Sequence, residues 1–189
     1  MHPISILFFA LASMIGKEDS SIVSRKVRVT INPTEKTFEI IQEDLFSIVK
    51  FPEDSVMVVN ELQYIMEFDN NTEHQDTSAL VVQELTLSRI DQQLNATLKG
   101  RYLGTEILAD AGISYDSTKA GEFFMMNIPE WNIHSTDAIL KEDYWVWSAD
   151  KPITIVIEPF TNIPEEYLMY KRSVLPFWER SKQLKPNNR

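Results

Sequence analysis

The sequence predicts a mainly β fold with minor α structure, in which an antiparallel sheet is folded as a small barrel or a sandwich. Several short segments show the alternation of apolar and polar residues that is typical of half-buried strands. These segments follow one another too closely to leave room for crossover helices. Hydrophobic residues make up 43% of the 189-residue chain, which is enough to bury one core without disulfides.

Composition divides the chain into four segments. We expect a signal peptide over residues 1–16, a linker over 17–24, a β-rich domain over 25–160 and a helical, basic extension over 161–189. This length fits one domain with terminal extensions.

The N-terminal segment predicts export to the periplasm, the cell envelope or the medium. Residues 4–15 form an uncharged run of 12, and charged residues begin at Lys17. Such a run is too short for a bilayer span, which needs about 20 residues, but it matches the apolar part of a signal peptide. Small residues in Ala10-Leu11-Ala12 predict cleavage between Ala12 and Lys17. Because the first three residues lack Lys and Arg, a buried N-terminal strand or helix is the alternative.

The β-rich domain begins with a predicted hairpin. Residues 26–31 alternate between polar and apolar, the Asn-Pro step in 32–35 predicts a turn, and residues 37–42 return. After the acidic pair at 43–44, β composition resumes over 45–51.

One helix is predicted near residues 55–67. Its acidic first turn, from Pro52 to Ser55, is typical of a helix start. The spacing from Leu62 to Phe68 also fits a strand, and residues 69–78 predict a polar loop.

The clearest strand covers residues 94–102, after a strand over 85–90 and a turn over 91–93. Its alternation predicts one buried and one exposed face. The predicted buried residues are Leu94, Ala96, Leu98, Gly100 and Tyr102, and the exposed residues are Asn95, Thr97, Lys99 and Arg101.

Two further strands are predicted over 107–115 and 122–128. In the second, residues 123–126 are apolar on both faces, which predicts a central strand covered on both sides.

The last predicted hairpin joins residues 143–148 to 153–158 through a short polar loop. Beyond Pro159 the composition changes to that of short helices, which begin at Pro164 and are interrupted at Pro176.

Charge is distributed unevenly along the chain. Residues 1–170 hold 12 Lys and Arg against 27 Asp and Glu, a net −15, whereas residues 171–189 hold six Lys and Arg against Glu179, a net +5. The acidic body should repel polyanions, which argues against a nucleic-acid partner.

No motif for metal, cofactor or nucleophilic chemistry is present in the sequence. The absence of cysteine excludes disulfides and thiolate ligands. Its five glycines form no phosphate loop, and its histidines form no His-x-x-x-His pair. Paired acids are sequence neighbours, whose side chains diverge in a strand or a helix. We therefore expect no cofactor and no metal.

Tryptophans are the candidate ligand-binding residues. Trp145 and Trp147 lie two apart on a predicted strand and so share a face, and Trp131 lies nearby in the sequence. They could stack on a sugar or enclose an apolar ligand, and the alternative is a buried core pair.

The basic extension is the candidate surface for a partner or for peripheral membrane contact. Phe177 and Trp178 lie close to Arg180, Lys182 and Lys185. The alternative is that this extension docks on the acidic body of its own chain. No transmembrane span is predicted.

Three functions compete on these observations. The first is a non-enzymatic domain that binds a ligand or a protein in the cell envelope. The second is a small-barrel hydrolase or isomerase that uses dispersed carboxylates such as Glu106 or Asp110. The third is a structural accessory protein without a pocket.

Overall fold

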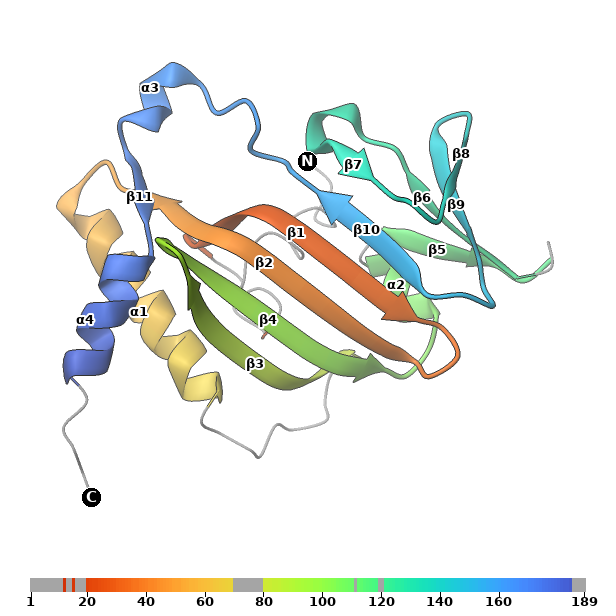
Figure 1. Cartoon of the computed structure of the whole chain (residues 1–189), viewed down its shortest axis with the longest axis horizontal. Coiled ribbons are helices and arrows are strands. Elements are labelled where there is room, and N and C mark those ends of the chain that lie inside the picture. Colours follow the sequence, from red (N-terminus) through yellow and green to blue (C-terminus); the bar gives the residue numbers. More distant parts are fainter. Residues whose placement is uncertain are drawn as a thin grey trace.

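A computed structural model describes residues 12, 15, 20–69, 80–110, 112–118 and 121–184. Its architecture is mainly antiparallel β with a few helices, which confirms the predicted fold class (Figure 1). Neither sheet closes on itself within the described residues, so the small barrel is not formed and a sandwich-like packing fits. The predicted signal peptide, apart from Ala12 and Ile15, lies outside the described residues. So does the loop predicted over 69–78, apart from Asp69, which is the last residue of α1.

The large sheet contains seven strands in the order β3-β4-β2-β1-β10-β7, and β11 also pairs with β2. All these pairs are antiparallel. The strands are β1 (Val23–Asn32), β2 (Thr37–Ile48), β3 (Leu80–Ile90), β4 (Gln93–Tyr102), β7 (Ile133–His134), β10 (Ile153–Ile157) and β11 (Lys171–Ser173).

The small sheet has the order β5-β6-β9-β8 and lies at one end of the large sheet (Figure 1). Its strands are β5 (Ile113–Asp116), β6 (Glu122–Met126), β8 (Ile139–Lys141) and β9 (Tyr144–Ser148).

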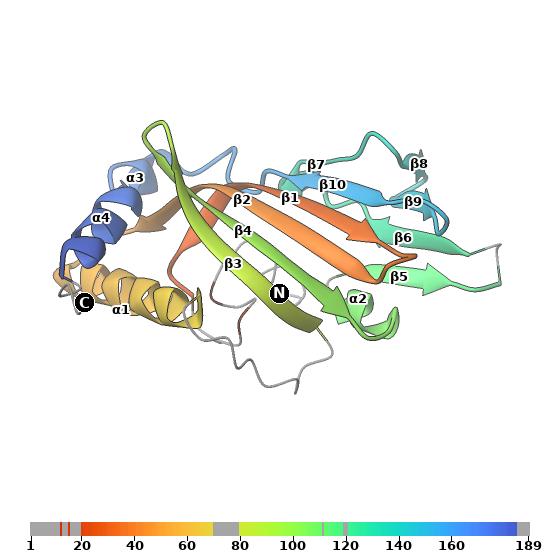
Figure 2. The ribbon, with the colours of Figure 1, turned by 60° about the horizontal axis from the view of Figure 1, so that its bottom comes forward.

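Helices α1, α3 and α4 cluster at the opposite end, whereas α2 lies beside β5 (Figure 1). Figure 2 shows α1 on one side of the large sheet and α3 on the other. The helical elements are α1 (Pro52–Asp69), α2 (Glu106–Asp110), the 3-10 turn η3 (Pro129–Trp131), α3 (Glu165–Leu168) and α4 (Leu175–Leu184).

Local sequence explains the boundaries that were predicted correctly. The side chain of Asn32 accepts hydrogen bonds from the N–H groups of Thr34 and Glu35, both at 3.1 Å, and so closes the β1–β2 turn. The carboxylate of Asp54 accepts the N–H of Phe51 at 2.8 Å, which is the reach-back bond of a helix N-terminus. The helix near 55–67 and the first hairpin are therefore confirmed.

The core lies between α1 and the facing side of the large sheet. One row of buried side chains crosses five strands: Leu85 pairs with Leu98, Leu98 with Ile40, Ile40 with Val29 and Val29 with Ile155. Burial of each such side chain contributes about 1.5–3 kcal/mol relative to exposure. This row explains why alternation in the sequence predicted these strands well.

The two strands predicted to form the last hairpin belong to different sheets. The predicted hairpin of 143–148 with 153–158 is wrong, because β9 pairs with β6 and β8 whereas β10 pairs with β1 and β7. The connecting turn stays with the small sheet through the N–H of Ala149, which donates to the carbonyl of Gly121 at 2.8 Å. Three buried isoleucines let β10 extend the core of the large sheet instead.

The strand predicted over 107–115 is partly helical. Its first half belongs to α2, and only β5 is extended. Gly112 has a φ of 79° and its N–H bonds to the carbonyl of Ala109 at 2.9 Å, so a glycine ends the helix in the left-handed region.

Residues 123–126 were predicted to form a strand buried on both faces, but β6 is buried on one face only. Phe123 and Met125 are buried, but Phe124 is half-buried and Met126 is 53% exposed.

The prediction that Asn95 is exposed is also wrong, because this residue of β4 is only 6% exposed. Its amide oxygen accepts the N–H of Asp44 at 3.0 Å. Asp44 has a φ of 57°, and this local twist of β2 leaves an N–H that the side chain of Asn95 satisfies. The other assignments on β4 are confirmed for the buried residues and for Lys99 and Arg101.

Candidate functional site

A cavity of about 490 Å³ lies where β1 begins and β2 ends. This volume is in the range of small-molecule sites. Its walls come from the two strands, from the segment that follows β10 and from α3. The lining residues are Ser21, Val23, Phe46, Ser47, Ile48, Pro159, Phe160, Asn162, Ile163, Pro164 and Tyr167.

Phe46 forms the floor of this cavity, which we call the Phe46 cavity. Its side chain is 1% exposed but does not belong to the main core cluster. The preceding residue, Leu45, does belong to that core, since neighbours on a strand point to opposite faces. The end of β2 is therefore apolar on both faces, with the core on one side and the cavity on the other.

Two contacts fix the ring of Phe46. Phe160 meets it edge to face, with ring centroids 5.4 Å apart and planes at 86°. The Nζ atom of Lys171 lies 4.3 Å from the centroid of the same ring. Lys171 is also 3.6 Å from Asp44, which in turn is 3.3 Å from Arg25, so this charge is shared within a small network.

Polar side chains are few in the Phe46 cavity: Ser21, Ser47, Asn162 and the hydroxyl-bearing Tyr167. Ser21 is fixed by the carboxylate of Glu61, which accepts its N–H and its hydroxyl, both at 2.6 Å. Glu61 is fully buried in α1 and also accepts from the hydroxyl of Ser20 and the N–H of Ile22. These donors satisfy the buried carboxylate and tie α1 to the wall of the cavity.

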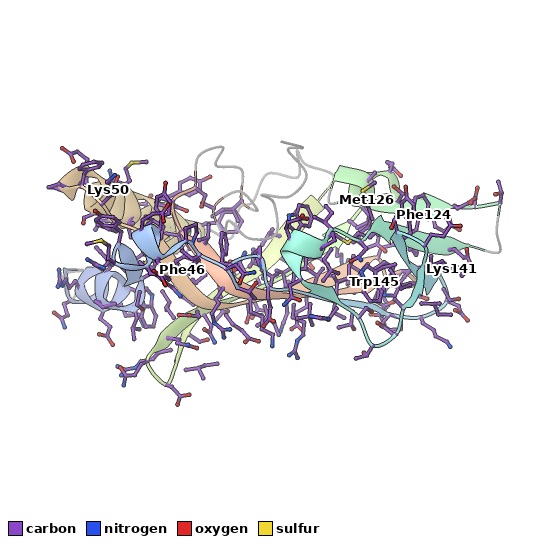
Figure 3. The ribbon with its side chains drawn as sticks, turned by 90° about the horizontal axis from the view of Figure 1, so that it is seen from above. Phe46, Lys50, Phe124, Met126, Lys141 and Trp145 are labelled. Atoms are coloured by element: carbon purple, nitrogen blue, oxygen red, sulfur yellow. The ribbon has the colours of Figure 1, made fainter. Side chains whose placement is uncertain are left out.

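At the edge of this end of the molecule, Tyr167 is 46% exposed. Nearby, the Nζ atom of Lys50 lies 5.4 Å from the ring centroid of Phe51 and 5.8 Å from that of Tyr170. Figure 3 shows Phe46 and Lys50 at the helical end, far from the labelled residues of the small sheet.

A second cavity of about 300 Å³ lies beside the small sheet. Three of its four charged residues have close partners: Glu122 pairs with Lys141 at 3.4 Å, and Asp137 accepts from the hydroxyl of Ser135 at 2.6 Å and from the N–H of Thr154 at 3.0 Å. The lining residues are Gly121, Glu122, Asp137, Ile139, Lys141, Val146, Trp147, Ser148, Lys151 and Pro152.

None of the three tryptophans is among the lining residues of the Phe46 cavity. Trp147 is 2% exposed, lines the second cavity and donates its indole N–H to the hydroxyl of Ser135 at 3.0 Å. Trp145 is half-buried and donates to the side chain of Asn127 at 3.1 Å. Trp131 is half-buried in η3. The structure therefore keeps Trp145 and Trp147 on one strand with both indole N–H groups satisfied, as buried tryptophans usually are.

Four of the five candidate contact residues of the C-terminal extension belong to α4. Trp178 is 8% exposed and belongs to the core cluster, and Phe177 is half-buried against it. Arg180 is exposed, and the Nζ atom of Lys182 lies 3.4 Å from the ring centroid of Trp178. Lys185 lies outside the described residues.

Among the residues that the structure describes, no group of three or more His, Cys, Asp or Glu side chains could hold a metal ion. In the same part of the chain, no helix has both the length and the apolar character needed to cross a membrane. Glu106 lies on α2, where its carboxylate packs beside Gly104: a methyl group added at Gly104 would come within 2.0 Å of Oε1.

No family model, no curated protein and no solved structure matches this chain. Function must therefore be argued from the site itself.

Sequence reasoning missed the Phe46 cavity because its walls come from three separate stretches of the chain. The signals that could have pointed to it are the adjacent pair Leu45-Phe46 and the apolar residues Phe160 and Ile163 between two prolines. A segment between prolines is stiff and poor in donors, so its apolar side chains can line a site without entering a strand.

Proposed function

We propose that this protein is an exported, non-enzymatic binding protein that holds a small apolar ligand in the Phe46 cavity. The observation that carries the proposal is a cavity of about 490 Å³ whose lining is mostly aromatic and aliphatic, with few polar side chains and no charged residue. Ligand sites are typically apolar clefts of this size in which a few polar groups fix orientation.

The arrangement around Phe46 supports a preformed site. Phe160 and Lys171 hold the ring from two directions, and Glu61 holds Ser21. A wall fixed before binding loses little conformational entropy when the ligand arrives, which favours affinity. We expect a ligand without net charge, since the lining contains no charged residue.

Binding of the neutral fluorophore N-phenyl-1-naphthylamine tests the proposal. The wild-type protein should bind it saturably with a stoichiometry near one. Ile163→Trp should fill the cavity and weaken binding about tenfold or more, because a filled pocket excludes the probe. Leu168→Trp is the matched control: Leu168 lies outside the lining and is 49% exposed, so affinity should change less than about twofold.

Two results would contradict this function. One is the absence of saturable binding by the wild-type protein. The other is an equal loss of affinity in Ile163→Trp and Leu168→Trp, which would place the probe elsewhere.

Export is the second part of the proposal, and the uncharged run over 4–15 supports it. N-terminal sequencing of protein made in its own host should give a first residue between 13 and 17. An intact Met1 on protein from the cytoplasm would contradict export.

An alternative is a hydrolase or isomerase that uses dispersed carboxylates. The second cavity favours it, because Glu122 and Asp137 both line that cavity. Such an enzyme should lose its activity in both Glu122→Gln and Asp137→Asn while Glu130→Gln, an exposed acid outside the cavity, keeps it. Full activity in both cavity variants would eliminate this alternative.

A further inference from the structure

Four exposed apolar side chains come together at the helical end of the molecule. Three belong to α3 and its C-terminus, and the fourth lies between β2 and α1. We call this set the apolar tip: Tyr167, Leu168 and Met169, exposed by 46%, 49% and 66%, and Phe51, exposed by 56%. Figures 1 and 2 both place α3 and the start of α1 at this end of the molecule.

Backbone pairing brings the two segments of the apolar tip together. Strand β11 pairs with the end of β2, and the ladder continues through the N–H of Val49, which donates to the carbonyl of Tyr170 at 2.9 Å. The Nζ atom of the next residue, Lys50, lies 5.8 Å from the ring centroid of Tyr170 and 5.4 Å from that of Phe51. The tip is therefore assembled by the fold from residues far apart in the sequence.

The apolar tip borders the opening of the Phe46 cavity. Tyr167 belongs to both, and two further lining residues of the same segment, Asn162 and Pro164, are exposed as well. The cavity therefore opens to solvent beside the tip. Clusters of large exposed apolar residues mark surfaces that bind a protein or a membrane.

Charged side chains of both signs surround the apolar tip. The Nη1 atom of Arg172 donates to the carbonyl of Met169 at 2.7 Å, which holds one cation at the tip itself. A zwitterionic phospholipid headgroup also carries both signs, so its phosphate can accept from the cations while its cationic end lies beside the acids. The surrounding charged residues are Lys50, Glu53, Asp54, Glu165, Glu166 and Arg172.

We infer that the apolar tip inserts into the interface of a zwitterionic phospholipid bilayer and so brings the opening of the Phe46 cavity to the membrane. Aromatic and aliphatic side chains beside Lys and Arg are typical of segments that bind at this interface. Anionic lipid is disfavoured, because residues 1–170 carry a net charge of −15. Docking gives the cavity access to apolar ligands dissolved in the bilayer. This use of the docking rests on the proposed function, whereas the docking itself does not.

Flotation with phosphatidylcholine vesicles tests the docking. The tip variant is Leu168→Ser with Met169→Ser, and both positions are exposed, so the fold should be retained. Its partition onto vesicles should fall at least about tenfold, because the inserted apolar area is lost. The matched control is Ile139→Ser with Leu140→Ser on β8, where the side chains are exposed by 66% and 48%. Partition of this control should change less than about twofold. All proteins keep the full chain, so the uncharged run over 4–15 contributes equally to each.

Three results would overturn docking through the apolar tip. The first is equal partition of the wild-type protein and the tip variant, or no partition of either. The second is binding that requires added phosphatidylglycerol and is lost in Arg180→Gln with Lys182→Gln, which would place the contact on the basic extension predicted from the sequence. The third is self-association in gel filtration that the tip variant abolishes, without vesicle binding, which would show that the tip binds a second copy of the chain.

Binding of N-phenyl-1-naphthylamine without vesicles separates the docking from the cavity. The tip variant should bind this probe as the wild-type protein does, since neither Leu168 nor Met169 lines the cavity. Ile163→Trp should float like the wild-type protein while it loses affinity for the probe. Flotation that depends on the tip, in a wild-type protein that binds no probe, would contradict the proposed ligand and leave the docking in place.

Discussion

The carboxylate of Glu61 binds both the backbone N–H and the hydroxyl of Ser21, each at 2.6 Å. Glu61 is fully buried in the middle of α1, and Ser21 precedes the first strand. One side chain thus joins a helix, the entry to the sheet and the wall of the Phe46 cavity. A buried carboxylate is tolerated here because several donors replace the water that it lost.

Removal of this carboxylate should destabilise the fold. Glu61→Leu leaves the N–H groups of Ser21 and Ile22 without their acceptor, and we expect a loss of about 2–4 kcal/mol in the free energy of unfolding. Glu61→Gln keeps one acceptor oxygen and should lose less. The control is Glu67→Gln on the exposed side of α1, where the expected change is below about 0.5 kcal/mol. Urea denaturation measures the free energy of unfolding of all three variants. Equal losses at positions 61 and 67 would show that the hydrogen bonds accepted by Glu61 do not stabilise the fold.

Asn95 should matter through the hydrogen bond that it accepts. In Asn95→Ala the N–H of Asp44 loses its partner at 3.0 Å, and we expect a loss of about 1–3 kcal/mol. Thr97→Ala, two residues along the same face of β4, is the control and should lose less. If both variants melt together, then water replaces the amide oxygen of Asn95 at no cost.

The case of Asn95 shows where sequence periodicity stops being informative. Alternation assigned β4 correctly because the face that packs against the core must be apolar at every second position. Asn95 lies on the other face and is buried by a local twist at Asp44, whose φ is 57°. A polar residue buried by a neighbouring strand has the same sequence signature as an exposed one.

Strands β9 and β10 show a second limit. Both were recognised as strands from their β-branched and aromatic residues, but their pairing was wrong. A short polar loop between two strands favours a hairpin only when the strands can bury the same face together. Here Ile155 continues the row that passes through Val29, whereas Trp147 pairs with Phe123. Partner choice was decided by residues distant in sequence.

The candidate site was harder to predict than the fold for the same reason. Residues near 21, 46 and 163 line one cavity, although the third group is far in sequence from the first two. Local patterns report which residues are buried by their own element. They carry no information on which buried residues leave a space between them.

Tyr102 should make the protein sensitive to alkali. Burial raises the pKa of Tyr102 above its ordinary value of 10.0, since the charged form is poorly solvated in the core. The unfolded chain therefore releases this proton first. The stabilising contribution is complete below about pH 10 and is lost as the pH rises through the raised pKa.

Tyr102→Phe should remove this part of the pH dependence. We expect the free energy of unfolding to fall less between about pH 8 and pH 11 in this variant than in the wild-type protein. Stability at pH 8 should change little, because the hydroxyl makes a long hydrogen bond of 3.4 Å to the carbonyl of Asn32. Tyr144→Phe, at an exposed position, should retain the wild-type pH dependence. Identical alkaline losses in wild type and Tyr102→Phe would exclude Tyr102 as the source.

In α4, the contribution of apolar packing to stability can be measured separately from that of surface charge. Trp178 is 8% exposed and lies in the core cluster, whereas Glu179 forms an ion pair with Arg89 at 2.7 Å on the surface. Both partners of this ion pair are more than two-fifths exposed, at 45% and 43% of their side chains. Exposed pairs contribute about 0–1 kcal/mol and are screened by salt, whereas loss of a buried tryptophan costs about 3–5 kcal/mol.

We therefore expect α4 to be held mainly by its apolar face. Trp178→Ala should lower the free energy of unfolding by about 3–5 kcal/mol, and the loss should be the same in about 0.05 M and 1 M sodium chloride. Glu179→Gln should cost no more than about 1 kcal/mol at low salt, and this cost should vanish at high salt. Lys182→Gln removes the cation above Trp178 and should cost about 0.5–1 kcal/mol. Urea titrations at the two salt concentrations make the comparison, and a Trp178→Ala loss that shrinks markedly at high salt would show that charge, rather than packing, holds the helix to the acidic body.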